Sequence, residues 1–283
     1  MSDLKLSIAV GPYDRMRPLM DGDVQIDGVD PVFMRLTPEE IFFRALRHQE
    51  FDVCELSLSS FSVKTARGDN PYVGIPVFPS RAFRHTAIYV RTDKGLKRPE
   101  DLKGRRIGVP EYQLTANVWA RAILAESGVK PSDITWVRGG LFDAGRVEKV
   151  DLNLPRDVRL EDAPPDTTIS AMLDAGAIDG IIAPRAPLGF DRGDKRIGWL
   201  FDDPIAAASE YYARTKIFPI MHVVGLRRTL ADAHAWLPAA LLKAFTKSKD
   251  IALDLLTDES APKASLPFVD VTIRKTRDMM SRD

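Results

Sequence analysis

Short apolar runs alternate along the chain with segments whose apolar residues recur at helical spacing. This alternation is typical of an α/β fold, in which strands lead into helices that pack back onto the sheet. The runs predicted as strands are 4–10, 29–37, 51–58, 72–78, 85–91, 105–110, 134–140, 179–184 and 217–228. The segments predicted as helices are 37–48, 59–68, 115–128, 167–177, 205–215, 229–257 and 268–281.

The helix predicted at 37–48 has a start signal of its own. Thr37 takes the N-cap position, Pro38 follows at the first helical position, and Glu40 lies three residues after the cap. This spacing is that of a capping box, in which the cap hydroxyl and the glutamate each bind a backbone N–H group of the other residue. We therefore expect both side chains to cap this helix.

Two long apolar strands, 85–91 and 217–228, bracket the middle third of the chain. If both pass between lobes, the protein consists of two α/β lobes joined by a two-strand hinge. Lobe I would then comprise residues 1–88 and 218–283, and lobe II residues 89–217. A ligand would be expected in the cleft between the lobes, where strand ends and helix N-termini meet.

The charge balance removes several classes of partner. The chain has 40 Lys and Arg residues against 40 Asp and Glu residues, so it has no net field that would attract nucleic acid or a membrane surface. Any recognition of an anion must therefore be local. We expect neither a nucleic-acid partner nor a membrane partner, and the oligomeric state is left open between a monomer and a homo-oligomer.

Cys54 is the single cysteine of the chain, which excludes an internal disulfide and makes a cysteine-based zinc site implausible. The four histidines are scattered, and the sequence lacks the motifs of zinc peptidases, P-loop proteins, serine hydrolases and dinucleotide-binding proteins. We expect no metal and no organic cofactor. The first residues lack a basic region, a long apolar stretch and a cleavage site, so a cytoplasmic protein is expected.

The segment FPSRAFRH (78–85) places two arginines and a histidine at the start of a predicted strand. Arg81 and Arg84 can form guanidinium forks on a substrate carboxylate, because bidentate geometry supplies both orientation and charge-assisted bonds. His85 can deliver a proton at neutral pH. The alternatives are solvated or ion-paired arginines, and a histidine that bonds only to backbone at a strand end.

His222 lies inside the strongly apolar run IFPIMHVVGL. A buried neutral histidine with one hydrogen-bond partner is the structural interpretation of this pattern. If 217–228 is a hinge strand, however, His222 lies beside His85, and the two form an acid and an orienting partner. His48 and His234 are interpreted as structural.

Other candidates follow predicted strands or open predicted helices. The loop PEYQ leads into a helix near Thr115, where backbone N–H groups can bind a carboxylate and Gln113 can assist, although simple capping explains the pattern equally well. Arg185 follows the strand IIAP directly, at an edge where ligands bind in open α/β sheets. Tyr13 and Ser59 have comparable positions after earlier strands.

Four blocks of sequence together resemble the 4,5-dihydroxyphthalate decarboxylase family. They are FPSRAFRHTAIYVR, PEYQLTANVWARAILAE, IIAPRAP and KIFPIMHVVGLRR. The resemblance implies a periplasmic-binding-protein type II fold without a secretion signal. Members of the family continue past a segment like TRDMMSRD with a further helix, so the resemblance also implies that this chain is truncated.

The resemblance further implies a reaction: conversion of 4,5-dihydroxyphthalate to protocatechuate with loss of carbon dioxide and without a cofactor. An aromatic carboxylate would be the small-molecule partner. Arg81, Arg84 and Arg185 would clamp the carboxylates, and His85 or His222 would donate the proton. One alternative is a non-catalytic solute-binding protein for an aromatic or small organic acid; another is a different reaction on a related carboxylated ring.

Overall fold

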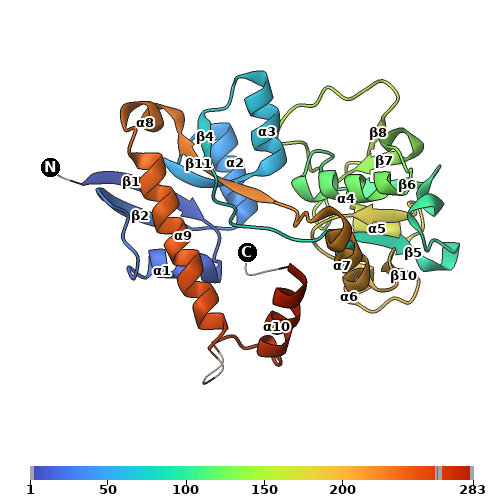
Figure 1. Cartoon of the computed structure of the whole chain (residues 1–283). Helices are drawn as coiled ribbons and strands as arrows, with labels where there is room; N and C mark the ends of the chain where they lie inside the picture. The colour runs from blue at the N-terminus through green and yellow to red at the C-terminus, as the bar shows by residue number, and fades with distance from the viewer. Residues whose placement is uncertain (1–2, 259, 261–262, 281–283) are drawn as a thin grey trace. The chain divides into compact units, whose positions relative to one another are not determined.

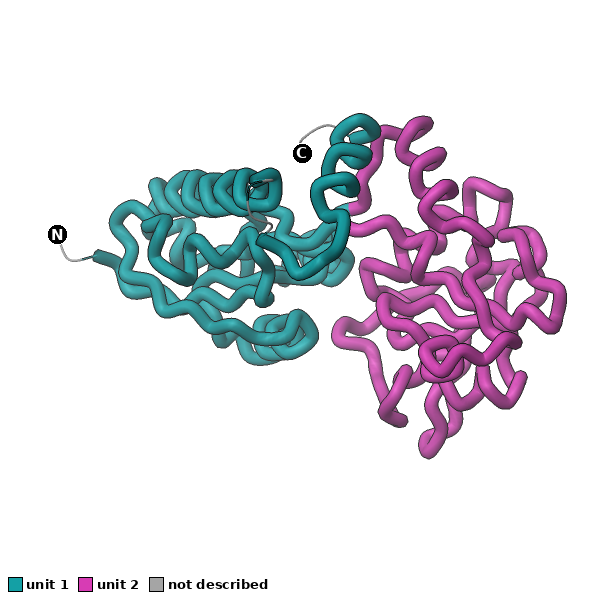
Figure 2. Tube along the Cα trace, turned by 90° about the horizontal axis from the view of Figure 1, so that it is seen from below, with its two compact units in different colours: residues 1–81, 220–283 teal, residues 82–219 magenta. Residues whose placement is uncertain are grey.

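The computed structural model describes residues 3–258, 260 and 263–280. The chain divides into two compact units, coloured separately in Figure 2. Unit 1 comprises Met1–Arg81 and Ile220–Asp283, and unit 2 comprises Ala82–Pro219. The chain thus passes between the units twice. The two passing segments pair with each other, since Arg81 forms an isolated bridge with Ile220 and the N–H group of Ala82 donates to Pro219 O over 3.0 Å.

Unit 1 contains a five-stranded mixed sheet in the order β2-β1-β3-β11-β4 (Figure 1). Its strands are β1 (Leu4–Val10), β2 (Val29–Arg35), β3 (Val53–Ser57), β4 (Tyr72–Ile75) and β11 (His222–Arg227). β1 is parallel to β2 and β3, whereas β11 is antiparallel to β3 and β4. The carboxyl ends of β1 and β3 therefore meet the amino end of β11 at one edge of the sheet.

The helices of unit 1 cover a core built from alternate strand residues. They are α1 (Arg17–Met20), α2 (Pro38–His48), α3 (Leu58–Arg67), α8 (Arg228–Ala233), α9 (Leu237–Leu256) and α10 (Val269–Met280). Leu6, Ile8 and Val10 of β1 pack with Leu241 and Phe245 of α9, all nearly inaccessible to solvent. Alternation along β1 and helical spacing along α9 place these residues on facing surfaces. The last residue predicted for the final helix, 281, lies outside the described residues.

α2 begins at Pro38 as predicted, but the predicted capping box was wrong. Thr37 has the extended backbone of an N-cap, yet its hydroxyl makes no capping hydrogen bond. Glu40 instead accepts a hydrogen bond from Arg44 Nη1 at 3.0 Å, one helical turn further on. Glu40 therefore forms an i,i+4 ion pair with Arg44 instead of the capping hydrogen bond that was predicted.

Unit 2 contains a six-stranded mixed sheet in the order β10-β5-β9-β6-β7-β8. The strands are β5 (Ile88–Arg91), β6 (Arg106–Val109), β7 (Thr135–Arg138), β8 (Arg159–Asp162), β9 (Gly180–Ile182) and β10 (Ile197–Trp199). The helices are α4 (Thr115–Glu126), α5 (Ile169–Asp174), α6 (Leu188–Asp191) and α7 (Pro204–Thr215). Ile107, Val109 and Leu124 pack around the fully buried Trp136 in its core.

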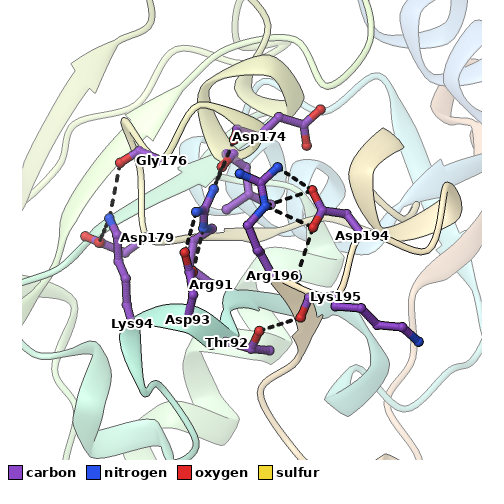
Figure 3. A network of polar contacts seen from close by, with 11 residues as sticks. Arg91, Thr92, Asp93, Lys94, Asp174, Gly176, Asp179, Asp194, Lys195 and Arg196 are labelled. Atoms are coloured by element: carbon purple, nitrogen blue, oxygen red, sulfur yellow. Dashed lines mark hydrogen bonds and ion pairs between the residues drawn. The ribbon is translucent and has the colours of Figure 1, made fainter.

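A network of charged residues secures one end of α5 in unit 2 (Figure 3). Arg91 is 6% exposed, and its Nη1 atom donates to Leu173 O and Asp174 O at 2.9 and 3.0 Å. Lys94 Nζ donates to Asp179 Oδ1 at 2.6 Å and to Gly176 O at 3.1 Å. These cations bind carbonyl groups at and just after the C-terminal end of α5, so their role here is structural.

The strands predicted at 85–91 and 217–228 are shorter than expected and do not pair with each other. Residues 85–87 form a 3-10 turn before β5, and β11 begins only at His222. β5 pairs with β9 and β10 in unit 2, whereas β11 pairs with β3 and β4 in unit 1. The expectation that His85 and His222 lie on paired strands was therefore wrong, because each strand finds its partners within its own sheet.

Two strands were not predicted at all. β8 lies in the polar stretch 146–166 and β10 consists of three residues, so neither has enough apolar residues for a periodicity signal. Within the described ranges, no helix is both long enough and apolar enough to cross a membrane.

Candidate functional site

A buried carboxylate lies in the sheet of unit 1, on the central strand β3. Glu55 is 0% exposed, and three donors converge on it. Its Oε2 atom accepts a hydrogen bond from Gly11 N at 3.0 Å, and its Oε1 atom accepts one from Tyr13 Oη at 2.7 Å and lies 2.5 Å from His222 Nδ1. An ionised carboxylate is purely an acceptor, so this set of donors fits an ionised Glu55.

The pairing of β3 with β11 explains how Glu55 and His222 meet. Glu55 lies opposite Val224, and Ser57 lies opposite His222. Residues two apart on a strand share one face of the sheet, so His222 is the diagonal neighbour of Glu55. The ring of Phe42 from α2 packs edge-on against the imidazole, with 4.9 Å between the ring centroids. The imidazole is thus held in one orientation, with its side chain 16% exposed.

Tyr13 reaches Glu55 because a glycine precedes it. A Cβ atom on Gly11 would lie 2.6 Å from the Tyr13 ring, so only glycine lets the ring fold back over the turn. The Arg15 guanidinium lies over the Tyr13 ring, with its Cζ atom 4.2 Å from the ring centroid. Burial and then the charge of Glu55 raise the pKa of Tyr13 far above its usual value, so the phenol remains a proton donor.

The segment 79–81 lies against the same cluster. Ser80 O accepts hydrogen bonds from Met221 N at 2.8 Å and His222 N at 3.2 Å, and the Ser80 side chain bonds to the Tyr13 hydroxyl. Arg81, which is exposed, pairs through its backbone with Ile220. The structure therefore brings Arg81, Tyr13 and His222 into one neighbourhood, although they are far apart in the sequence.

The start of α3 adds polar groups at the same edge of the sheet. Ser57 ends β3 opposite His222, and its hydroxyl oxygen lies 3.4 Å from that of Ser59 in the first turn of α3. The first N–H groups of a helix favour negative charge, so this turn is suited to a carboxylate. Ser59 thus lies close to His222 as well.

His85 has a different environment in unit 2. It is 3% exposed and lies among aromatic rings, with centroids 5.2 Å from Phe201 and 5.5 Å from Tyr211. Among the described residues, its Nδ1 atom has no hydrogen-bond partner. Burial lowers the pKa of His85 to about 4, so the imidazole is neutral near pH 7. This environment favours His222 over His85 as a proton donor.

We expect His85 to limit the stability of the protein in acid. The unfolded chain protonates this histidine near pH 6.5 and the folded protein only near pH 4, so the free energy of unfolding falls as the pH drops through this interval, by about 1–3 kcal/mol. His85→Leu should flatten that fall. Denaturant midpoints at several pH values measure the fall in stability, and His48→Gln, at an exposed position, is the control. An equal fall in acid for wild type and His85→Leu would contradict the prediction.

The other predicted ligand contacts belong to unit 2. Arg84 is half-buried, and burial lowers its pKa to about 10, so it keeps its charge at neutral pH. Arg185 is exposed just after β9. Gln113 and Thr115 are buried at the start of α4. Gln113 Nε2 donates to Glu111, 3.3 Å away, and Glu111 also pairs with Arg146 and Lys149, so the polar loop is held by its own charges.

Glu55 was not among the residues singled out from the sequence. The signal for it was an acidic residue inside the apolar run FDVCELSL, because a carboxylate in a buried strand requires partners. Its partners, however, lie 42 or more positions away in the chain. Among the described residues, no three His, Cys, Asp or Glu side chains gather as metal ligands would.

Comparison with known proteins relates the chain to one family of enzymes. The chain is 62% identical over 284 residues to 4,5-dihydroxyphthalate decarboxylase from Comamonas testosteroni. The aligned region covers 100% of this chain and 86% of that protein. It is 61% identical over 213 residues to the protein of the same name from Pseudomonas putida. That aligned region covers 75% of this chain and 83% of the Pseudomonas putida protein. Residues 82–152 also match a family model described as NMT1/THI5 like.

Solved structures show the same fold at low sequence identity. The periplasmic aliphatic sulphonate binding protein SsuA from Escherichia coli has a TM-score of 0.54 and 14% identity, covering 99% of this chain and 84% of that chain. The alkanesulfonate-binding protein SsuA from Xanthomonas axonopodis pv. citri has a TM-score of 0.53 and 13% identity, and the match covers 99% of this chain and 85% of that chain. The predicted fold class, α/β of the periplasmic-binding-protein type, is confirmed.

The match to the Comamonas testosteroni protein covers the whole chain and therefore both units. The chain belongs to the 4,5-dihydroxyphthalate decarboxylase family.

Proposed function

We propose that this protein decarboxylates 4,5-dihydroxyphthalate to protocatechuate, with His222 as the proton donor. The observation that carries the proposal is the contact of His222 Nδ1 with the fully buried carboxylate of Glu55, at 2.5 Å. A carboxylate behind an imidazole orients it and stabilises its protonated form, as a general acid requires. The names of the two relatives support the choice of substrate.

The chemistry of the substrate explains why one proton donor is central. Each ring hydroxyl is para to one carboxylate-bearing carbon, so polarising that hydroxyl pushes electron density onto the ipso carbon. A general acid then protonates this carbon, which forms a C–H bond and interrupts aromaticity. The C–C bond to the carboxylate breaks next, its electron pair returns to the ring, and carbon dioxide leaves. One proton is taken up for each carbon dioxide released, and solvent restores it to the acid.

The residues around His222 can supply the other requirements. Glu55 occupies Nδ1, which leaves Nε2 as the atom that gives its proton to the substrate. Arg81 and the first turn of α3 at Ser59 are suited to the substrate carboxylates. The ligand contacts expected of Arg84, Arg185, Gln113 and Thr115 in unit 2 stay predictions, as does Tyr13 as a direct contact.

A turnover assay with two related substrates tests the proposed function. Purified protein is incubated with 4,5-dihydroxyphthalate, and protocatechuate is followed by absorbance and mass spectrometry. Phthalate is the matched control, because without para hydroxyl groups it cannot accept a proton at the ipso carbon and should remain unchanged. Binding of 4,5-dihydroxyphthalate without any product would overturn the enzymatic assignment and favour a solute-binding protein. A cytoplasmic location is part of the proposal and is tested by cell fractionation.

A further inference from the structure

We propose that Tyr13 is a positioning residue that tunes the proton affinity of His222 through their shared acceptor, Glu55 Oε1. This inference rests on the proposed function, in which His222 is the acid. Tyr13 Oη and His222 Nδ1 lie 2.7 and 2.5 Å from the same oxygen atom. Two donors on one oxygen compete for its charge, so the hydrogen bond from the phenol weakens the hold of Glu55 on the imidazole proton.

The geometry of the phenol supports a positioning role for it. Its hydroxyl is engaged by Glu55 on one side and by the Ser80 side chain on the other, and its ring is fixed between Gly11 and the Arg15 guanidinium. The raised pKa of Tyr13 means that it stays a donor across the pH range in which an imidazole titrates. The second oxygen of Glu55 is held separately by Gly11 N, so the carboxylate cannot turn away to relieve the competition.

Several elements contribute to the electrostatic surroundings of His222. α2 contacts the imidazole through the apolar ring of Phe42, and the first turn of α3 carries the neutral Ser59. Charged or titratable residues beside this cluster on β3, the turn 11–15 and the segment 79–81 include Cys54, Glu55, Tyr13, Asp14, Arg15 and Arg81; those of α2, α3 and β11 are Glu39, Glu40, Arg44, Arg47, His48, Lys64, Arg67 and Arg227. Cys54 is adjacent to Glu55 on β3, so alternation points its thiol to the opposite face of the sheet. Arg15 is paired with Asp14 at 3.2 Å, and Glu55 is a charged residue in direct contact with the imidazole.

The test is Tyr13→Phe, which removes one hydroxyl and keeps the ring. Without the competing donor, Glu55 should hold the imidazolium more strongly, so the titration midpoint of His222 should rise by about 0.5–1 pH unit, a three- to tenfold gain in proton affinity. Nuclear magnetic resonance of the imidazole signals measures this directly. The chain has four histidines, so the His222 signal is assigned by its loss in His222→Gln.

The kinetic counterpart is the alkaline limb of kcat/KM, which should move upward by the same amount because the protonated imidazole is the active form. Tyr72→Phe is the matched control: it removes another phenol hydroxyl in unit 1, bonded to Phe51 O at 3.1 Å, and should leave both midpoints unchanged. Gly11→Ala keeps the phenol but forces the ring aside, and should shift His222 in the same direction as Tyr13→Phe.

Two results would overturn the inference. One is an unchanged or lowered His222 midpoint in Tyr13→Phe. The other is a raised KM for Tyr13→Phe with an unmoved alkaline limb, which would make Tyr13 a direct substrate contact. The resonance measurement needs no turnover, so the coupling can be read even if the wild-type protein fails to decarboxylate the substrate. Failure of the proposed function and failure of this inference are therefore separate outcomes.

Discussion

His222→Gln should lower kcat for 4,5-dihydroxyphthalate by about 10²- to 10⁴-fold, with a much smaller effect on substrate binding. Glutamine fills a similar volume and can still donate to Glu55, but it cannot deliver a proton to the ipso carbon. Because protonation of carbon occurs only on the way to the transition state, its loss should appear in kcat rather than in ground-state affinity. Product formation and calorimetric binding of the substrate measure the two effects separately.

His48→Gln and His85→Gln are the comparison variants for this experiment. His48 is exposed at the end of α2, and a change there should leave the rate within a factor of about two. His85→Gln distinguishes the two candidate acids. If it abolishes turnover in a folded protein while His222→Gln does not, the assignment of the proton donor to His222 is wrong.

Glu55→Gln should lower kcat by about 10²-fold or more, even though it changes only one atom of the carboxyl group. In one orientation of the amide, its NH₂ group faces Gly11 N–H, and two donors oppose each other. In the other orientation, the NH₂ group faces Tyr13 and His222, and the imidazole must accept at Nδ1, which reverses its tautomer. Neither orientation reproduces the acceptor-only carboxylate.

Glu55→Asp provides the rescue arm of the experiment. It keeps the charge but shortens the reach, so it should retain more activity than Glu55→Gln. Thermal unfolding and circular dichroism check that both variants are folded. Wild-type turnover in a folded Glu55→Gln would show that the carboxylate has only a structural role.

Local signals were sufficient for much of the fold. The start of α2 at Pro38, the alternation of β1 and the apolar runs of β3 and β11 were readable because secondary structure depends mainly on neighbouring residues. The exact ends were less accurate: the strand predicted at 72–78 stops at Ile75, directly before Pro76, which cannot donate to a sheet. The short strands β8 and β10 were missed for lack of any periodic pattern.

The candidate site shows where local information ends. The sequence places Tyr13, Arg81 and Ser59 near the ends of predicted strands or helices, and His222 inside an apolar strand. The structure gathers all four at one edge of the unit 1 sheet. The sequence leaves the proton donor open between His85 and His222, because nothing in FPSRAFRH shows that the His85 ring is enclosed by Phe201 and Tyr211. Those two residues lie more than a hundred positions further along the chain.

The sequence by itself determined the α/β class, the family resemblance, the lack of a general attraction for anions and a short list of polar candidates. Only the tertiary structure decided that Glu55 is the shared partner of Tyr13 and His222, and that His85 is a buried neutral histidine. The physical reason is that the surroundings of a side chain determine whether it can donate a proton. Burial, a neighbouring carboxylate and strand register set the behaviour of an imidazole, and all three depend on contacts between residues distant in the chain.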